Sequence, residues 1–275
     1  MSPTPQLVEG VGGQRWSVTL RGEGPVLLAV HGTGSSGHSF DPLAEHLAGY
    51  TWVVPDLPGH GHSTQDRREG PALPAFASGL GRVLDRLQLE PEVALGHSAG
   101  AAVLAQMALD GRLAPRLFVG LGAALVPFPP LQQSVASLSA RMLARSGAGR
   151  VLARLAKRSA MAELLTPEDR IGPRQLAAYR RLAADPAHVE GVLAMLGRWD
   201  VAPLHKALDR VPGPWLLLAG EADRVVPAHH QRLAASRIPQ ARLAVLPGGH
   251  LLHEARPALV GAAIAEEIGR LHQCV

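Results

Sequence analysis

Residues 96–100 read Gly-His-Ser-Ala-Gly, a pattern that places Ser98 between two glycines. A serine hydroxyl becomes a nucleophile when a histidine takes its proton and a carboxylate orients that histidine. Two such partners follow in the chain, Asp223 in LLLAGEADRVVP and His250 in LAVLPGGHLLH. The order Ser, Asp, His is one that serine hydrolases use. We therefore predict that Ser98, Asp223 and His250 form a catalytic triad for acyl transfer.

Each predicted partner of Ser98 has a rival. Asp200, in RWDVAPL, is a second candidate acid, and His253 is a second candidate base. Asp223 is favoured because it directly follows a buried apolar run, whereas Asp200 lies in a helical stretch. His250 is favoured because it follows an apolar run and two glycines, which let the chain bend. The alternatives are a serine in a small-residue turn and an aspartate that caps a helix or turn.

The oxyanion that forms during acyl transfer needs N–H donors beside the nucleophile. The loop after the apolar run 26–30 begins HGTG, and its Thr33 N–H is one candidate donor. The Ala99 N–H, next to Ser98 at a predicted helix start, is the second. We expect His31 to hold the loop in shape. The residues expected to line the substrate pocket are Gly32, Ser35, Ser36, His38 and His97.

These polar residues need a sheet that brings them to one edge. Short apolar runs at 26–30, 92–96 and 215–220 predict buried strands, and helical patterns at 73–89 and 99–109 lie between them. Strands that alternate with helices predict βαβ units and a mostly parallel sheet. Ligands bind at the carboxyl ends of the strands in such sheets. The predicted fold class is therefore α/β, with a mostly parallel central sheet flanked by helices.

Other parts of the chain depart from this alternation. The first 30 residues predict a β-meander, and residues 40–50 predict a helix. The stretch 126–211 lacks a convincing buried strand and consists of helical patterns separated by prolines and glycines. We predict a core domain built from residues 1–125 and 212–275, with residues 126–211 as a helical cap over the active site.

Composition and cysteine content exclude several classes of protein. The net charge of +4 comes almost entirely from arginine, without a dense basic block or a nucleic-acid motif, so no nucleic-acid partner is expected. The one cysteine, Cys274, cannot form an internal disulfide, and we see no signal peptide or membrane-spanning run, so we predict a cytoplasmic protein. The histidine pairs His60 and His62, and His229 and His230, lack a third ligand at diagnostic spacing. We therefore expect neither a metal nor a cofactor.

Over nearly its whole length the sequence resembles the α/β-hydrolase fold family. The motifs that carry the resemblance are HGTG, PDLPGHGHS, GHSAG, GEADRVVP and GGHLLHEARP, in that order. The resemblance implies an α/β-hydrolase fold with a triad of Ser98, Asp223 and His250. Within the family the chain is similar to the magnesium-chelatase accessory proteins of bacteriochlorophyll biosynthesis, notably through DPAHVEGVLAMLGRWDVAPL at 185–204. That similarity implies a role in photosynthetic tetrapyrrole synthesis, with magnesium-chelatase subunits as candidate partners.

Arginines recur at near-helical intervals in the predicted cap. They are Arg141, Arg145, Arg150, Arg154 and Arg158. One interpretation is a pair of amphipathic helices with solvated arginines. The other is a basic rim over an apolar groove, which could hold porphyrin carboxylates or rest peripherally on an anionic membrane surface.

Two functions from different classes are consistent with these observations. The favoured one is a serine hydrolase that cleaves an ester of a small hydrophobic substrate, such as a tetrapyrrole methyl ester, through an acyl-enzyme on Ser98. The alternative is a non-catalytic porphyrin-binding protein or assembly factor for magnesium chelatase. A cofactor-free peroxidase or a C–C hydrolase on the same fold is a further alternative.

Overall fold

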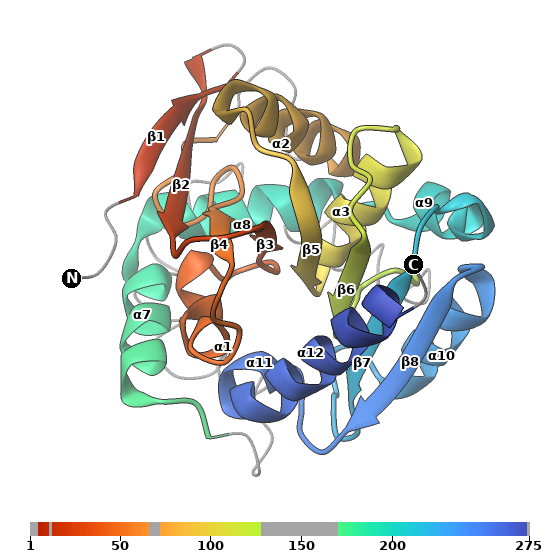
Figure 1. Ribbon diagram of the computed structural model, residues 1–275. Coiled ribbons are helices and arrows are strands. Elements are labelled where there is room, and N and C mark those ends of the chain that lie inside the picture. Colours follow the sequence, from red (N-terminus) through yellow and green to blue (C-terminus); the bar gives the residue numbers. More distant parts are fainter. Residues whose placement is uncertain (1–4, 11–12, 66–71, 128–169, 274–275) are drawn as a thin grey trace.

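A computed structural model describes residues 5–10, 13–65, 72–127 and 170–273 of the chain. These residues build an eight-stranded sheet (Figure 1). The strands are β1 (Gln6–Glu9), β2 (Arg15–Arg21), β3 (Val26–Val30), β4 (Thr51–Pro55), β5 (Pro91–His97), β6 (Leu117–Leu121), β7 (Trp215–Gly220) and β8 (Ala241–Leu246).

The strands lie in the order β1-β2-β4-β3-β5-β6-β7-β8. β1 and β2 are antiparallel to their neighbours, and every pair from β4 to β8 is parallel. The predicted mostly parallel α/β sheet is therefore confirmed. The predicted β-meander is wrong beyond β1 and β2, because β2 pairs with β4 and β3 lies between β4 and β5. The run of β3 is almost wholly buried, which suits an interior position, whereas β1 and β2 carry exposed residues at the edge.

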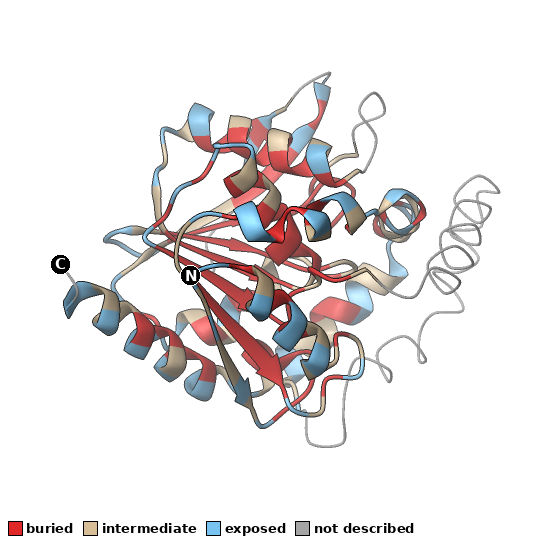
Figure 2. Cartoon of the chain, turned by 90° about the vertical axis from the view of Figure 1, so that its right-hand side faces the viewer, coloured by how far each residue is buried: buried red, intermediate tan, exposed pale blue. Residues whose placement is uncertain are grey.

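Helices cover both faces of this sheet. The longer ones are α2 (Leu73–Leu87), α3 (Ala99–Leu109), α7 (Pro173–Ala184), α8 (Pro186–Arg198), α10 (Ala228–Arg237) and α12 (Pro257–Gln273). The shorter ones are η2 (Gly37–Phe40), α1 (Asp41–Ala44), α9 (Ala202–Lys206), η3 (Leu208–Arg210) and α11 (Leu252–Ala255). Residues of α2, α3 and α10 share one apolar core, and residues of α1, α11 and α12 share a second. Figure 2 shows the strands buried between helices that are exposed only on their outer sides.

Alternation along each strand assigns its side chains to the two cores. Leu28 packs in the core beneath α2 and α3, while its neighbour Leu27 packs in the core beneath α12. Leu217 and Leu218 divide in the same way on β7. Because successive side chains point to opposite faces of a strand, a strand covered on both faces must be apolar throughout. The continuous apolar runs of the sequence therefore follow from a sheet with helices on each side.

The segment expected to be a helix at 40–50 is helical only over α1. Residues 45–50 form turns, and Gly49 takes a positive φ of +87° before β4 begins at Thr51. The indole N–H of Trp52 donates to the carbonyl of Leu47 at 3.3 Å, which ties this turn to β4. The return to the sheet thus stops the helix after one turn.

The segment predicted as a cap is helical where the structure describes it. Residues 170–211 contain α7, α8, α9 and η3. The five arginines named above for the cap lie outside the described residues, as does Cys274. The division into core and cap domains stays a prediction. Within the described ranges, no helix is both long enough and apolar enough to cross a membrane.

Candidate active site

Ser98 lies in a sharp turn between β5 and α3. Its backbone has φ +52° and ψ −116°, a conformation that is energetically unfavourable for an L-residue. Such backbone strain is typically found at functional sites. The two flanking glycines make the turn sterically feasible. A Cβ at Gly96 would lie 2.5 Å from Cα of Ala101, and a Cβ at Gly100 would collide with the carbonyl oxygen of Val30. The turn presents the Ser98 hydroxyl at the carboxyl edge of the sheet.

Asp223 and His250 meet at the same edge. His250 Nδ1 lies 2.8 Å from Asp223 Oδ2, and both side chains are almost fully buried. The other carboxylate oxygen, Oδ1, accepts from the N–H groups of Val225 and Val226, each at 2.8 Å. With Nδ1 donating to the carboxylate, Nε2 of a neutral His250 is left as a proton acceptor. This arrangement can hold an imidazole in the orientation that general-base catalysis needs.

The two rival residues have other surroundings. Asp200 is exposed, and its Oδ1 accepts from the Ala202 N–H at 2.9 Å at the start of α9. His253 is fully buried, and neither ring nitrogen has a hydrogen-bond partner among the described residues. Burial lowers the pKa of His253 to about 3, so the ring is neutral. The structure therefore pairs His250 with Asp223 and leaves Asp200 in a capping role.

Gly122 lies directly against this pair, and the sequence interpretation did not single it out. It follows β6 with φ +49°, and a Cβ there would lie 3.1 Å from Asp223 Oδ2 and 3.2 Å from His250 Nδ1. A side chain at this position would press on both partners. The signal in the sequence is a glycine immediately after a buried strand.

The loop after β3 packs against the turn at Ser98. A Cβ at Gly32 would lie 2.9 Å from Ser98 Cβ, so this loop lies directly against the turn that carries Ser98. His31 holds the loop: its Nδ1 donates to the Gly32 carbonyl at 2.8 Å, and its Nε2 accepts from the Leu57 N–H at 2.9 Å. Burial lowers the pKa of His31 to about 3, which suits a neutral ring with one donor and one acceptor.

Ser98 and His250 share a cavity of about 380 Å³ with several of the residues predicted for the site. The predicted residues that line it are Thr33, Ser35, His97, Ser98, Ala99 and His250. Its volume falls within the range of small-molecule sites. Three other predicted pocket residues do not line this cavity. Gly32 packs closely against Ser98, and Ser36 Oγ pairs at 2.8 Å with Nδ1 of His38, which lines a separate cavity.

His97 adds a further link between the turn at Ser98 and His250. Its Nε2 lies 3.0 Å from the backbone carbonyl of His250, and its ring packs between those of His250 and His253, at 4.7 and 4.4 Å between centroids. Burial lowers the pKa of His97 well below its usual range, and the two neighbouring histidines lower it further. A neutral His97 can thus donate from Nε2 and fix the backbone that carries His250.

The remainder of the cavity wall is mostly apolar and comes largely from α8 and the loop after β7, with a smaller part from α7. These apolar residues are Ala124, Ala183, Val189, Val192, Leu193, Leu196, Trp199, Val225, Val226 and Leu251. Because α7 and α8 belong to the predicted cap, the choice of ligand depends on that segment as well as on the sheet. An apolar wall beside Ser98 and His250 suits a hydrophobic ligand group.

Comparison with known proteins identifies the family. A family model for the alpha/beta hydrolase fold matches residues 25–257. The chain belongs to the α/β-hydrolase family. It is 40% identical over 244 residues to the magnesium-chelatase 30 kDa subunit of Rhodobacter capsulatus, covering 84% of this chain and 82% of the relative.

Two further α/β-hydrolase relatives are esterases. The chain is 32% identical over 258 residues to a pimeloyl-[acyl-carrier protein] methyl ester esterase of Xanthomonas oryzae pv. oryzae, covering 85% and 90% of the two chains. A thermophilic esterase from Thermogutta terrifontis, solved with malate bound, matches with a TM-score of 0.80 and 25% identity over 98% and 99% of the two chains. The resemblance predicted from the motifs is therefore confirmed, and the relatives support hydrolase activity in general.

The topology of this α/β-hydrolase explains how distant residues meet. Ser98 follows β5, Gly122 follows β6, Asp223 follows β7 and His250 follows β8. These four strands are consecutive neighbours in the sheet and parallel. Their carboxyl ends therefore form one row, where the side chains that follow them can face a common ligand.

Of the four histidines in the pairs named above, only His60 is a buried ring in this α/β-hydrolase. His60 packs against His31 and His188, at 5.5 and 5.3 Å between ring centroids. Burial lowers the pKa of His60 well below its usual range. Across the described ranges, no group of three or more His, Cys, Asp or Glu residues is arranged to hold a metal ion.

Proposed function

We propose that this α/β-hydrolase is a serine hydrolase that cleaves an ester of a hydrophobic substrate through an acyl-enzyme on Ser98. The observation that carries the proposal is the buried contact of 2.8 Å between His250 Nδ1 and Asp223 Oδ2, beside a cavity that also contains Ser98. A histidine oriented in this way, next to a serine in a strained turn, is the arrangement that activates a hydroxyl.

The reaction would proceed in two halves. His250 Nε2 takes the Ser98 proton as Oγ attacks the ester carbonyl, and the resulting oxyanion accepts from the N–H groups of Thr33 and Ala99. The oxyanion collapses, the bond to the alcohol breaks, and His250 returns its proton to that alcohol. Water then attacks the acyl-enzyme with His250 again as the base, which releases the acid and restores the Ser98 hydroxyl. Asp223 stabilises the imidazolium in both halves.

The substrate class follows from the cavity wall and the relatives. The apolar residues of α7 and α8 favour a hydrophobic acyl or alcohol group, and one relative is a methyl ester esterase. Because another relative is a magnesium-chelatase subunit, we propose a tetrapyrrole methyl ester as the candidate substrate. The cavity is near the lower end of the usual volume range, so it suits the ester-bearing arm of a large molecule.

A second candidate function is favoured by that same relative. A protein 40% identical to a magnesium-chelatase subunit could bind a porphyrin or assist assembly of the chelatase without using Ser98. In that role the apolar cavity would bind and release its ligand unchanged.

The test compares the wild type with Ser98→Ala. A fluorophosphonate probe should label the wild type and leave Ser98→Ala unlabelled, because the probe traps an activated serine. Porphyrin binding is measured on both proteins by fluorescence. An unlabelled wild type would overturn the hydrolase proposal, whereas labelling at Ser98 together with loss of pathway function in Ser98→Ala cells would overturn the purely non-catalytic alternative.

A further inference from the structure

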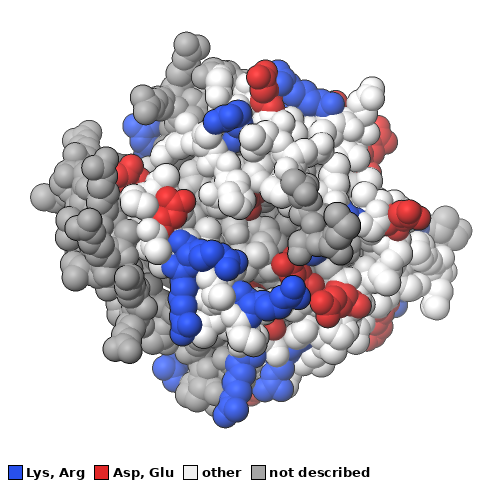
Figure 3. Space-filling model, turned by 90° about the vertical axis from the view of Figure 1, so that its left-hand side faces the viewer, with Lys and Arg blue, Asp and Glu red and all other residues white. Residues whose placement is uncertain are grey.

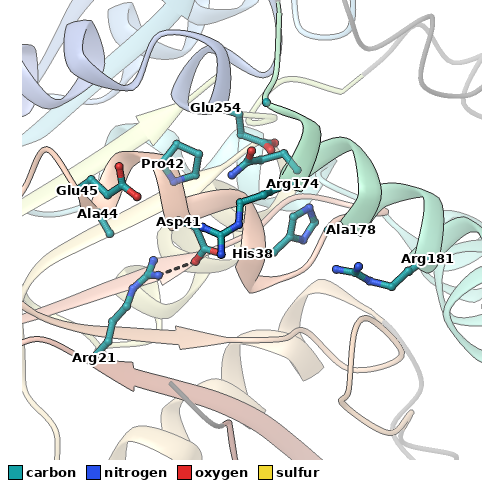
Figure 4. A pocket seen from close by; sticks show the side chains of 12 residues that line it. Arg21, His38, Asp41, Pro42, Ala44, Glu45, Arg174, Ala178, Arg181 and Glu254 are labelled. Carbon is teal, nitrogen blue, oxygen red and sulfur yellow. Dashed lines mark hydrogen bonds and ion pairs between the residues drawn. The ribbon is translucent and has the colours of Figure 1, made fainter. Parts of the chain in front are cut away.

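We call the cavity lined by Ser98 and His250 the catalytic cavity, after its proposed role. A second cavity, of about 710 Å³, lies on the other side of α7 from it. It opens on the face that carries α7, where basic side chains border a hollow (Figure 3). Its ionisable wall residues include Arg21, Asp41, Glu45, Arg174, Arg181 and Glu254. They come from β2, α1, α7 and α11, except that Glu45 directly follows α1. Figure 4 shows their side chains around the cavity. We call this space the arginine cavity; it contains none of the proposed catalytic residues.

Helix α7 separates the two cavities by its periodicity. Arg174, Ala178 and Arg181 recur at spacings of four and three residues and line the arginine cavity. Tyr179 and Ala183, on another side of the same helix, line the catalytic cavity. Residues spaced by three and four lie on one helix face, so α7 presents a basic face to one cavity and a mostly apolar face to the other.

The charges in the arginine cavity do not cancel. Arg21 forms an ion pair with Asp41 and also lies over the Trp52 ring, 5.7 Å from its centroid. Within the described part of the chain, Arg174 and Arg181 have neither an ion pair nor a side-chain hydrogen bond, although both border the cavity. Because Asp41 is paired with Arg21, Glu45 and Glu254 are the acidic wall residues left to balance the positive charges of Arg174 and Arg181.

The buried position of Glu254 weakens its ability to balance the arginines, because burial favours the protonated form of its carboxyl group. Its side chain is fully buried, and Oε1 accepts from the Tyr179 hydroxyl at 2.6 Å. Burial raises the pKa of Glu254 to about 8, opposed by the Tyr179 hydrogen bond and assisted by Asp41. Oε2 is buried and has no hydrogen-bond partner among the described residues. A protonated Glu254 thus has an unused O–H donor at the wall of the cavity (Figure 4).

We propose that the arginine cavity is a second ligand site, which binds a carboxylate or phosphate group through Arg174 and Arg181, with the carboxyl group of Glu254 as a further donor. Guanidinium groups bind planar oxyanions through paired N–H bonds. The arginines are seven residues apart, or about 10 Å along the helix, so a ligand with two or more acid groups can contact both. A cationic ligand is disfavoured by the two uncompensated arginines.

The site can communicate with the catalytic cavity through a short polar chain. Ser35 Oγ lies 3.2 Å from the Tyr179 hydroxyl, which in turn donates to Glu254. Ser35 and Tyr179 line the catalytic cavity and Glu254 lines the arginine cavity.

Two sources of the acid group fit this geometry: a separate anion, or an acid group of the ester substrate itself.

The test measures binding of citrate and inorganic phosphate to Ser98→Ala protein by calorimetry, with sodium chloride at matched ionic strength as the reference. Replacing the two arginines together by glutamine should weaken citrate binding about a hundredfold, since each charged hydrogen bond lost costs about tenfold. The matched control is Arg180→Gln, an exposed residue of the same helix that lines neither cavity. Glu254→Gln retains a donor and should bind within a few-fold of the parent.

The outcomes separate cleanly. Unchanged citrate affinity in the double variant, an equal loss in Arg180→Gln, or no binding by the parent would each overturn the second site. Thermal unfolding of every variant shows whether a loss reflects misfolding, and the double lysine variant, which keeps the charge, should recover part of the affinity. None of these measurements uses hydrolysis, so their failure is distinct from failure of the proposed function.

Steady-state kinetics of ester hydrolysis identify the source of the acid group. This part of the test rests on the proposed function. If the substrate carries it, the double glutamine variant should raise KM for a p-nitrophenyl hemiester of a dicarboxylic acid about tenfold and leave p-nitrophenyl acetate unchanged. If a separate anion carries it, both esters should respond alike, and citrate should alter turnover of both in the wild type only. Citrate binding that affects neither ester would place the site apart from catalysis and still support it as a ligand site.

Discussion

Asp223 and His250 are 27 residues apart in the chain, yet their side chains lie 2.8 Å apart, and His250 lines the cavity that also contains Ser98. The contact exists because the two residues follow neighbouring strands, β7 and β8, which run parallel. The second oxygen of Asp223 is already held by two backbone N–H groups of its own loop. Oδ2 is therefore the carboxylate oxygen left to accept from His250, and the backbone contacts of Oδ1 fix its orientation.

Asp223→Asn should lower kcat by about 10⁴-fold, because an asparagine can donate to Nδ1 and thereby favour the wrong tautomer of His250. Asp200→Asn should leave the rate within twofold, since Asp200 caps α9 on the surface. Steady-state hydrolysis of p-nitrophenyl esters measures both. If Asp200→Asn carries the loss instead, the pairing of Asp223 with His250 has no catalytic role.

Gly122→Ala should reduce kcat by more than its cost in stability explains. A methyl group there would lie 3.1 Å from Asp223 Oδ2 and 3.2 Å from His250 Nδ1, so the pair must shift. Gly111→Ala is the matched control, because Gly111 also has a positive φ, +66°, and nothing lies within 4 Å of its Cβ position. Both variants should lose about 1–2 kcal/mol in urea unfolding from the left-handed backbone. Equal rates in the two variants would contradict the steric argument.

Ser98→Gly should unfold at higher urea than Ser98→Ala, with a difference of about 1 kcal/mol. Ser98 and any alanine in its place must hold φ +52° and ψ −116°, which glycine adopts freely. Gln88→Gly gives a reference, since Gln88 has φ +52° at the end of α2 without any role in the site. A Ser98→Gly protein no more stable than Ser98→Ala would show that the turn stores no strain.

The buried histidines should make the protein sensitive to acid. The pKa values of His31 and His253 are lowered to about 3 by burial, so both stay neutral in the folded state while the unfolded chain binds protons below pH 6.5. A group whose folded pKa is depressed contributes stability above its unfolded pKa and loses it as pH falls. Each residue should therefore cost about 2 kcal/mol between pH 6.5 and 5.

His253→Leu checks this sign directly. His253 has no hydrogen-bond partner among the described residues, so leucine removes the titration without removing a hydrogen bond. The urea midpoint of unfolding should decrease from pH 7 to pH 5 in both proteins, and the decrease should be smaller in the variant than in the wild type. The opposite result would mean that His253 is protonated in the folded protein.

Local patterns predicted much of this molecule correctly. The apolar runs within β3, β5 and β7 were recognisable because a strand covered on both faces is mostly apolar. The turn at Ser98 was recognisable because only glycine fits at Gly96 and Gly100, where backbone atoms of neighbouring segments approach. Both constraints act within a few residues or on side-chain type alone.

Other features could not be predicted because they depend on which strands become neighbours. The pairing of β2 with β4, the short α1 and the position of Gly122 against the Asp223–His250 pair are all long-range results. The Ser35–Tyr179–Glu254 chain joins residues 144 and 75 positions apart. No periodicity in the sequence indicates such contacts.

By itself, the sequence determined the α/β fold class and the sharp turn at Ser98, since periodicity and glycine spacing are local properties, and its motifs indicated the family. Only the tertiary structure showed that Asp223 lies against His250, because that contact depends on the carboxyl ends of β7 and β8 lying side by side. It also decided which arginines of α7 border a second cavity, because helix periodicity separates the faces of a helix without saying what each face meets.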